Sequence, residues 1–476
     1  MSMENVESKS KIINPLQPVE GPELIFGMIG PVGSNLKHVC QTLSKELKDA
    51  GYDPHEISVS SLIKLVYPHE SIPEHEDKRI EKLMSLGTKF RQATVDGSVL
   101  ALMAVVKIRE VRQTATGNPN VPASRKAYIL RSLKRPEEVA ALRAIYGEFF
   151  FLISAYLPRE KRVSTLATEI AKSQGKLPDA DRFRSKAEHL VSKDEEEEGA
   201  DFGQDVSEAF PMADFFVSAD SRASIKEGIS RFVEILFGYQ FHTPSKDEMG
   251  MYLARSSALR SADLSRQVGA VIATPDGDII SIGCNEVPKA LGGQYWPSDA
   301  NDDRDFIRGY DSSTVSKSQI IRELIHKLKE DIPDAIFSEG KKEEEISDYL
   351  LEGTGRKIFK GTQIQNLLEF GRPVHAEMAA ITTAARLGFS IKGTTLYSTT
   401  FPCHMCARHI ISSGIKRVVY IEPYPKSRVK DLYHDSVVID PERLVEDKVN
   451  FQPFVGIAPS RYLEFFEIAS KRKDDT

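Results

Sequence analysis

The chain has 476 residues, of which 41% are hydrophobic and 28% are charged, and its formal net charge is −6. This length is enough for two or three domains with their own cores, and the negative charge disfavours a protein that generally coats nucleic acid. No apolar run approaches the ~18 residues of a membrane span, and residues 1–20 are polar, so we expect a flexible leader, a cytoplasmic protein and no membrane partner.

The first ordered elements are predicted to be a strand, a glycine-rich turn and a helix. Residues 23–29 form an apolar run typical of a buried strand, and residues 36–47 have helical apolar spacing. A turn between a strand and a helix is the setting of a phosphate-binding loop, where backbone N–H groups meet an anion. The candidate nucleotide-binding residues are Gly27, Gly30, Gly33, Ser34 and Asn35.

This turn departs from the phosphate-binding motif G-x-x-x-x-G-K-[ST]. Ser34 and Asn35 follow the last glycine, and Lys37 is out of register for the motif's lysine. Without that lysine the loop loses its main contact to β- and γ-phosphates. A tight turn without any ligand is the alternative, and we expect nucleotide binding or regulation rather than phosphoryl transfer.

Strands and helices continue to alternate through the N-terminal half. Strands are predicted at 127–130, 149–154 and 214–218, with helices opening near Pro136 and Ser224. The acidic run Asp194–Glu198 is predicted to be a solvated loop. The segment Leu133–Val139 and this order of elements resemble nucleoside-monophosphate-kinase-like P-loop proteins over about residues 21–240. The resemblance implies a parallel sheet.

A second domain is predicted for residues 241–476. After a linker at 242–245 we expect a helix at 247–260, strands at 266–273 and 279–284 joined by an Asp-Gly hairpin turn, and later strands at 394–398 and 417–421. Helices between the later strands give a mixed sheet with ββαβαβ connectivity. Residues 286–373 are longer than this core requires, so we expect an insertion that shapes a pocket or a subunit contact.

Two short motifs in this domain predict a catalytic zinc site. His375 is followed by Glu377, and Pro402 precedes Cys403 and Cys406, with Pro402 in the first turn of a helix. One imidazole and two thiolates make three protein ligands, which leaves the fourth position of Zn²⁺ open for water. Glu377 is placed to move protons, as in the H-x-E and P-C-x-x-C signature of zinc nucleobase deaminases. A redox C-x-x-C or a closed structural zinc site is the alternative.

Residues 247–460 resemble the cytidine and deoxycytidylate deaminase superfamily. The segments Arg266–Val271 and Gly283–Pro288 are similar to the deoxycytidylate branch, in which the asparagine that matches Asn285 contacts the sugar of the substrate. A turn-forming role for Asn285 is the alternative. Many deoxycytidylate deaminases have asparagine at the position of Ala379, so the resemblance leaves open how many phosphates the substrate carries.

The two halves together define the expected fold class, α/β with a P-loop kinase-like parallel sheet followed by a cytidine-deaminase-like mixed sheet. This fusion resembles the bacterial antiphage dCTP deaminases. The resemblance implies deamination of dCTP and dCMP, a second nucleotide or regulator at the N-terminal domain, and a homo-oligomer such as a hexamer. A deaminase of polynucleotide cytosine or adenine, and a nucleotide-binding regulatory protein with structural zinc, are the alternatives.

Overall fold

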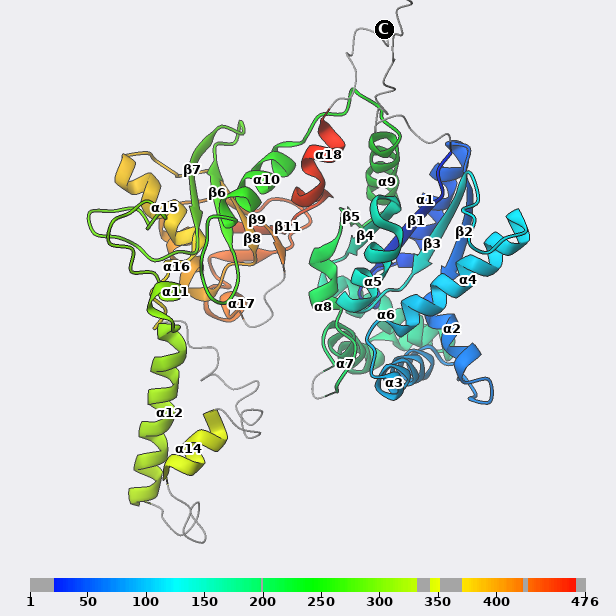
Figure 1. Ribbon diagram of the computed structural model, residues 1–476, viewed down its shortest axis with the longest axis horizontal. Helices are drawn as coiled ribbons and strands as arrows, with labels where there is room; N and C mark the ends of the chain where they lie inside the picture. The colour runs from blue at the N-terminus through cyan, green and yellow to red at the C-terminus, as the bar shows by residue number, and fades with distance from the viewer. Residues whose placement is uncertain (1–20, 198–199, 332–342, 352–369, 423–426, 468–476) are drawn as a thin grey trace, which may run out of the picture. The chain divides into compact units, whose positions relative to one another are not determined.

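The computed structural model describes residues 21–197, 200–331, 343–351, 370–422 and 427–467 (Figure 1). The predicted leader and parts of the predicted insertion therefore lie outside the described residues. The chain divides into two compact units, Met1–Thr243 with Val455–Thr476, and Pro244–Phe454. The sequence assigned all of residues 241–476 to one domain, whereas the described residues from Val455 onward pack with the first unit.

The first unit is built on a six-stranded sheet in the order β12-β5-β4-β1-β3-β2. Strands β1 to β5 run parallel, and β12 joins β5 in the antiparallel direction through Gly456 and Ile457. The strand bounds are β1 Leu24–Ile29, β2 Asp53–Ser58, β3 Lys126–Arg131, β4 Phe150–Tyr156, β5 Phe215–Ser218 and β12 Gly456–Ile457. The predicted parallel sheet is confirmed.

Helices cover both faces of this sheet (Figure 1). Alternate residues of β1, Leu24, Phe26 and Met28, share a buried core with α1 and α9, because side chains along a strand alternate between its faces. The helix bounds are α1 Leu36–Asp49, α2 Val59–Val66, α3 Glu76–Thr94, α4 Val99–Thr116, α5 Pro136–Tyr146, α6 Arg159–Ser173, α7 Arg184–Glu195, α8 Val206–Ala209, α9 Arg222–Leu236 and α18 Tyr462–Phe466.

The second unit holds a mixed six-stranded sheet in the order β10-β11-β9-β8-β6-β7. β6 is antiparallel to both β7 and β8, whereas β8, β9, β11 and β10 run parallel to one another. The predicted ββαβαβ connectivity is confirmed from β6 to β9. The strand bounds are β6 Gly269–Ala273, β7 Ile279–Cys284, β8 Thr395–Thr400, β9 Arg417–Glu422, β10 Val437–Ile439 and β11 Val449–Pro453.

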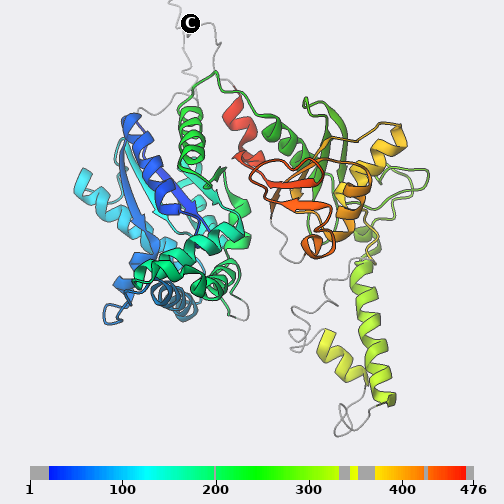
Figure 2. The same ribbon diagram turned by 180° about the vertical axis from the view of Figure 1, so that it is seen from behind.

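Of the helices of this unit, α10 and α15 lie against the sheet, whereas α12 and α14 extend away from it (Figure 2). The helix bounds are α10 Lys246–Ala258, α11 Asp305–Arg308, α12 Ser312–Asp331, α14 Glu343–Leu351, α15 Ala376–Leu387, α16 His404–Ser412 and α17 Val429–Leu432. A Cβ on Gly283 of β7 would lie 2.4 Å from the carbonyl oxygen of Ala376, at the start of α15. Glycine at this position therefore lets the N-terminus of α15 approach the sheet. Among the described residues, none of the helices has the length and apolar character to cross a membrane.

Candidate active site

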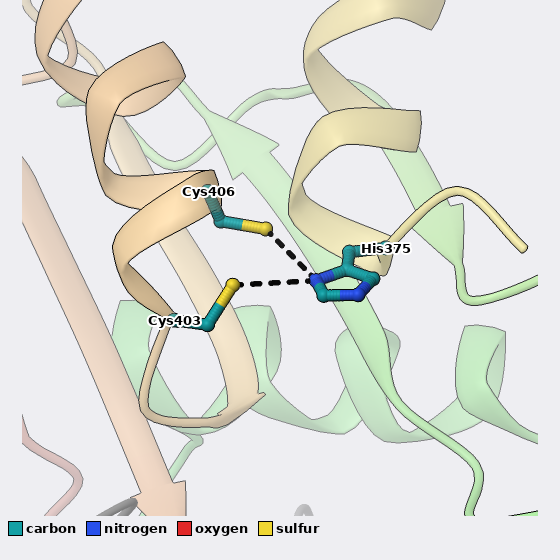
Figure 3. A group of neighbouring side chains, drawn as sticks. All are labelled: His375, Cys403 and Cys406. Atoms are coloured by element: carbon teal, nitrogen blue, oxygen red, sulfur yellow. Dashed lines mark hydrogen bonds between the residues drawn. The ribbon is translucent and has the colours of Figure 1, made fainter. Parts of the chain in front are cut away.

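The N-termini of two helices meet in the second unit. His375 is the N-cap residue of α15, which begins at Ala376, and Cys403 is the N-cap residue of α16, which begins at His404. Pro402 thus precedes the helix, whereas the sequence had predicted it in the first turn of the helix. Along the chain, α15 comes directly before β8, and α16 lies between β8 and β9. The first turns of the two helices face one another (Figure 3).

These helix starts bring one imidazole and two thiols together (Figure 3). The Nδ1 atom of His375 lies 3.4 Å from the Sγ of Cys403 and 3.3 Å from the Sγ of Cys406. Two ligands at ~2.1 and ~2.3 Å from a tetrahedral zinc ion lie about 3.6 Å apart. The spacing and the nitrogen and sulfur donors therefore fit a zinc ion, and the predicted group of His375, Cys403 and Cys406 is assembled in the fold.

The electrostatics of the three donors favour a cation between them. A hydrogen bond with Cys406 lowers the pKa of the Cys403 thiol, which favours its thiolate form. The hydrogen bond with Cys403 raises the pKa of His375 to about 9, while the pKa of Cys406 lies well above its ordinary value, chiefly because of Cys403. A metal ion competes with the protons at such sites.

Glu377 lies in the first turn of α15, next to these donors. Its Oε2 atom accepts a hydrogen bond from the Sγ of Cys406 at 3.4 Å, and its Oε1 atom lies 3.5 Å from the Oγ of Ser398 in β8. Glu377 is buried, and desolvation raises its pKa. A carboxyl group with a raised pKa is suited to both taking up and releasing a proton near neutral pH.

A cavity of about 450 Å³ opens onto His375, Glu377 and Cys403. Asn285 lines it, and its Oδ1 atom accepts a hydrogen bond from the backbone N–H of Val268 at 2.7 Å. Its Nδ2 atom donates to the carbonyl oxygen of Arg266 at 2.8 Å. Asn285 therefore lies on the cavity wall and also holds the distant backbone at Arg266 and Val268, whereas the alternative was a turn-forming role.

Several residues of the cavity wall come from the insertion and were not predicted individually. Asp305 of α11 and Asp311, Ser313, Thr314 and Lys317 at the start of α12 line the cavity together with Arg266. Arg372 holds Asp305 through an ion pair of 2.8 Å. These residues form no recognisable sequence motif. Only the fold of the insertion brings them to the cavity wall. The predicted pocket-shaping role of the insertion agrees with this wall.

The candidate nucleotide-binding residues lie in the first unit, in two places. Gly27 belongs to β1, and the other four lie in the turn between β1 and α1. Gly27 lies inside β1, where a Cβ would meet Leu133 and Phe150 at 2.8 Å. Gly33 has a φ of +86° and Asn35, the N-cap residue of α1, has a φ of 56°, so the turn itself is tight and left-handed at two positions. Gly30 and Ser34 face each other in the turn, since a Cβ on Gly30 would lie 2.5 Å from the Ser34 Oγ.

Comparisons with known proteins identify part of the second unit. The model of the cytidine and deoxycytidylate deaminase zinc-binding region matches residues 244–422. The deoxycytidylate deaminase of Enterobacteria phage T2 is 53% identical over 55 residues, which cover 12% of this chain and 29% of the phage protein. The probable deoxycytidylate deaminase of Drosophila melanogaster is 34% identical over 122 residues, which cover 24% of this chain and 59% of that protein. The chain thus spans less than two thirds of either relative.

Two solved structures were also found to be similar. The dCMP deaminase of cyanophage S-TIM5 has a TM-score of 0.24 and 16% identity over 45% of this chain and 100% of that chain. A gluconokinase from Sinorhizobium meliloti 1021 has a TM-score of 0.22 and 16% identity over 47% of this chain and 99% of that chain. The family match and the His375, Cys403 and Cys406 cluster agree in residues and in donor chemistry. The C-terminal half of the chain therefore carries a zinc-binding domain of the cytidine and deoxycytidylate deaminase family of hydrolases.

Proposed function

We propose that the protein is a zinc-dependent deaminase that converts deoxycytidine nucleotides, dCTP or dCMP, to deoxyuridine nucleotides. The observation that carries the proposal is the buried Glu377 carboxyl group beside the His375, Cys403 and Cys406 donors on the wall of a cavity. A structural zinc site has four protein ligands and no use for such a carboxyl group. The relatives named above act on deoxycytidylate, which supports the choice of base and sugar.

The roles of the residues follow from their positions. His375, Cys403 and Cys406 would hold the zinc ion, which supplies an activated water at neutral pH. Glu377 would take one proton from the attacking water and deliver it to N3 of cytosine, and would then carry the second proton of that water to the amine, which leaves C4 as ammonia. The overall change is cytosine plus water to uracil plus ammonia. Asn285 is proposed to contact the deoxyribose from the cavity wall.

The cavity favours a free nucleotide over a polynucleotide. Arg266 and Lys317 are cationic groups on the described part of the wall, and they suit the phosphates of one nucleotide. Asp263, Asp305 and Asp311 line the same cavity and would repel the continuous phosphate backbone of a strand. The net charge of −6 also disfavours a polynucleotide substrate.

We further propose that the N-terminal unit regulates the deaminase and that the protein works as a homo-oligomer. The fusion of a P-loop-like half to a deaminase half resembles antiphage dCTP deaminases, so the proposed physiological outcome is depletion of dCTP during infection. The number of subunits is a matter for analytical ultracentrifugation.

A nucleotide panel tests the proposed reaction. Purified full-length protein is incubated with dCTP, dCMP, CTP, dATP and single-stranded DNA, and the products are separated by chromatography, with Glu377→Ala as the control. We expect deoxyuridine nucleotides from dCTP or dCMP and none from the variant. Conversion of the single-stranded DNA alone, or equal product from Glu377→Ala, would contradict the proposal.

A further inference from the structure

The glycine-rich turn of the first unit already contacts an anion, and this anion belongs to the chain itself. The backbone N–H of Val32, in the middle of the turn, donates a hydrogen bond to the Oδ2 of Asp194 at 2.8 Å. Asp194 lies in the last turn of α7 and its side chain is 0% exposed. The predicted solvated loop at Asp194–Glu198 is therefore wrong for Asp194, because this carboxylate is enclosed at the turn.

A cation that the sequence motif lacks is present at the same place. The Nζ of Lys134 lies 2.8 Å from one carboxylate oxygen of Asp194 and 2.9 Å from the other, and it donates to the carbonyl oxygen of Gly30 at 3.3 Å. Lys134 comes shortly after β3, the strand next to β1 in the sheet. A neighbouring strand thus supplies the positive charge that a phosphate-binding motif places directly after the turn.

A second basic residue comes from the other neighbour of β1. Arg162 of α6 follows β4, and its carbonyl oxygen lies 2.5 Å from the position of a Cβ on Gly33. Its Nη2 atom forms an ion pair with Glu195 at 2.7 Å, again an acidic residue of α7. The turn, Lys134 and Arg162 therefore occupy the carboxyl edge of three adjacent parallel strands, which is where ligands bind in open α/β sheets.

Two buried side chains at this edge have hydrogen-bond donors without an acceptor. Within the described part of the chain, the Oγ of Ser34 and the Nη1 of Arg162 have no hydrogen-bond partner. The Ser34 side chain is 2% exposed and its hydroxyl lies inside the turn, against Gly30. A buried donor without a partner costs free energy, about 1–3 kcal/mol, so each such group needs an explanation, and a ligand that binds there is one. A carboxylate has two oxygens, whereas a phosphate group offers three or four.

We propose that the turn Gly30–Asn35, with Lys134 and Arg162, is a binding site for a phosphate-bearing ligand, and that Asp194 is an internal anion that occupies it until the ligand displaces it. A phosphate group would accept from the Val32 N–H and the Lys134 ammonium, which now bind Asp194, and from Ser34 and Arg162, which lack partners. Displacement frees the end of α7. The apparent affinity for phosphate is reduced by the fraction of molecules in which Asp194 occupies the site.

Titration calorimetry on the full-length protein with inorganic pyrophosphate tests this competition. Asp194→Asn keeps the shape of the side chain and removes its charge, so we expect it to bind pyrophosphate roughly tenfold or more tightly than the unmodified protein. Glu188→Gln is the matched control, because it removes one charge from an exposed ion pair with Arg184 on the same helix. The Lys134→Met change is expected to abolish the gain in the Asp194→Asn background. Equal or weaker binding by Asp194→Asn, or an equal gain from Glu188→Gln, would overturn the proposal.

Hydrogen exchange on the unmodified protein provides a test that does not depend on any variant folding. With pyrophosphate at millimolar concentration, the amides of residues 32–35 should exchange more slowly and those of residues 190–196 more rapidly. Slower amide exchange at the turn together with faster amide exchange at the helix end would show that pyrophosphate has replaced Asp194. Unchanged exchange at both segments would show that Asp194 closes the turn permanently, and the proposed site would then be rejected.

Discussion

The Oε2 of Glu377 lies 3.4 Å from the Sγ of Cys406, although the two residues belong to different helices. This distance joins the predicted proton-transfer group to a predicted metal ligand. Helix α15 packs against β6 and β7 and also contacts α16, and the chemistry of the site depends on that arrangement.

The carboxyl group of Glu377 is predicted to be essential for turnover but not for metal binding. Glu377→Gln keeps the size of the side chain but cannot exchange a proton, so kcat should fall by roughly 10²–10⁴-fold. Zinc content, measured by mass spectrometry of the metal, should stay at the unmodified level. A variant that loses its zinc would instead place Glu377 among the ligands.

Removal of a thiol of the cluster is predicted to affect zinc binding, whereas removal of the Cys284 thiol is not. Cys406→Ala should lose zinc and activity together, because two protein ligands hold the ion far more weakly than three. Cys284→Ala is the matched control, since Cys284 is also buried but lies outside the cluster, and it should retain full zinc. Metal analysis after gel filtration makes the comparison, and full zinc in Cys406→Ala would refute the ligand assignment.

Asn285 is predicted to act on the substrate as well as on the backbone. Asn285→Asp keeps an acceptor for the Val268 N–H but loses the Nδ2 donor, which should lower kcat/KM for the nucleotide by about 10–100-fold. Asn450→Asp is the matched control: Asn450 is buried in the same unit and bonds only to backbone groups in the described contacts. The control should lower the unfolding temperature and leave KM unchanged. Parallel effects of both changes on KM would argue for a purely structural Asn285.

The close approach at Gly283 makes a prediction about stability. Gly283→Ala places a Cβ 2.4 Å from the Ala376 carbonyl oxygen, and backbone on both sides resists the shift, so we expect a loss of about 1–3 kcal/mol. Activity should fall as well, because α15 carries His375 and Glu377. Gly87→Ala in α3 serves as a control with ordinary contacts of 3.5 Å or more, and its greater helix propensity should leave stability unchanged or raise it by up to about 1 kcal/mol. Urea unfolding and a turnover assay measure both, and equal stability of the two variants would contradict the packing argument.

Breaking the ion pair of Arg91 and Glu138 in the first unit is predicted to lower the free energy of unfolding strongly. Both side chains are buried, with the Arg91 Nη2 at 3.1 Å from the Glu138 Oε1. Glu138→Gln leaves the Arg91 charge without a counter-ion and should cost about 3–5 kcal/mol of unfolding free energy. Glu110→Gln removes a charge from the exposed pair with Lys107 and should cost about 0–1 kcal/mol. Similar urea midpoints for the two variants would exclude a special role for the buried pair.

The sequence by itself determined the elements with strong local patterns. The apolar runs predicted β1, β3, β4 and β5, and the Asp-Gly turn predicted the β6–β7 hairpin. The ligand types and Glu377 were also readable, because metal chemistry restricts the residues and their spacing within each motif. The edge strand β2, Asp53–Ser58, was missed since its Pro54 and charged residues are typical of a sheet edge and give little hydrophobic signal.

Only the tertiary structure decided which distant groups meet. Asp194 resembles any solvated acidic residue until Lys134, 60 positions away, and Val32, 162 positions away, are brought to it by the parallel sheet. The return of Gly456 and Ile457 to β5 and the cavity wall from the insertion also depend on long-range packing. The physical reason is that a local pattern encodes a residue's own conformation and preferred burial, whereas the partners that satisfy a buried charge come from other strands and helices.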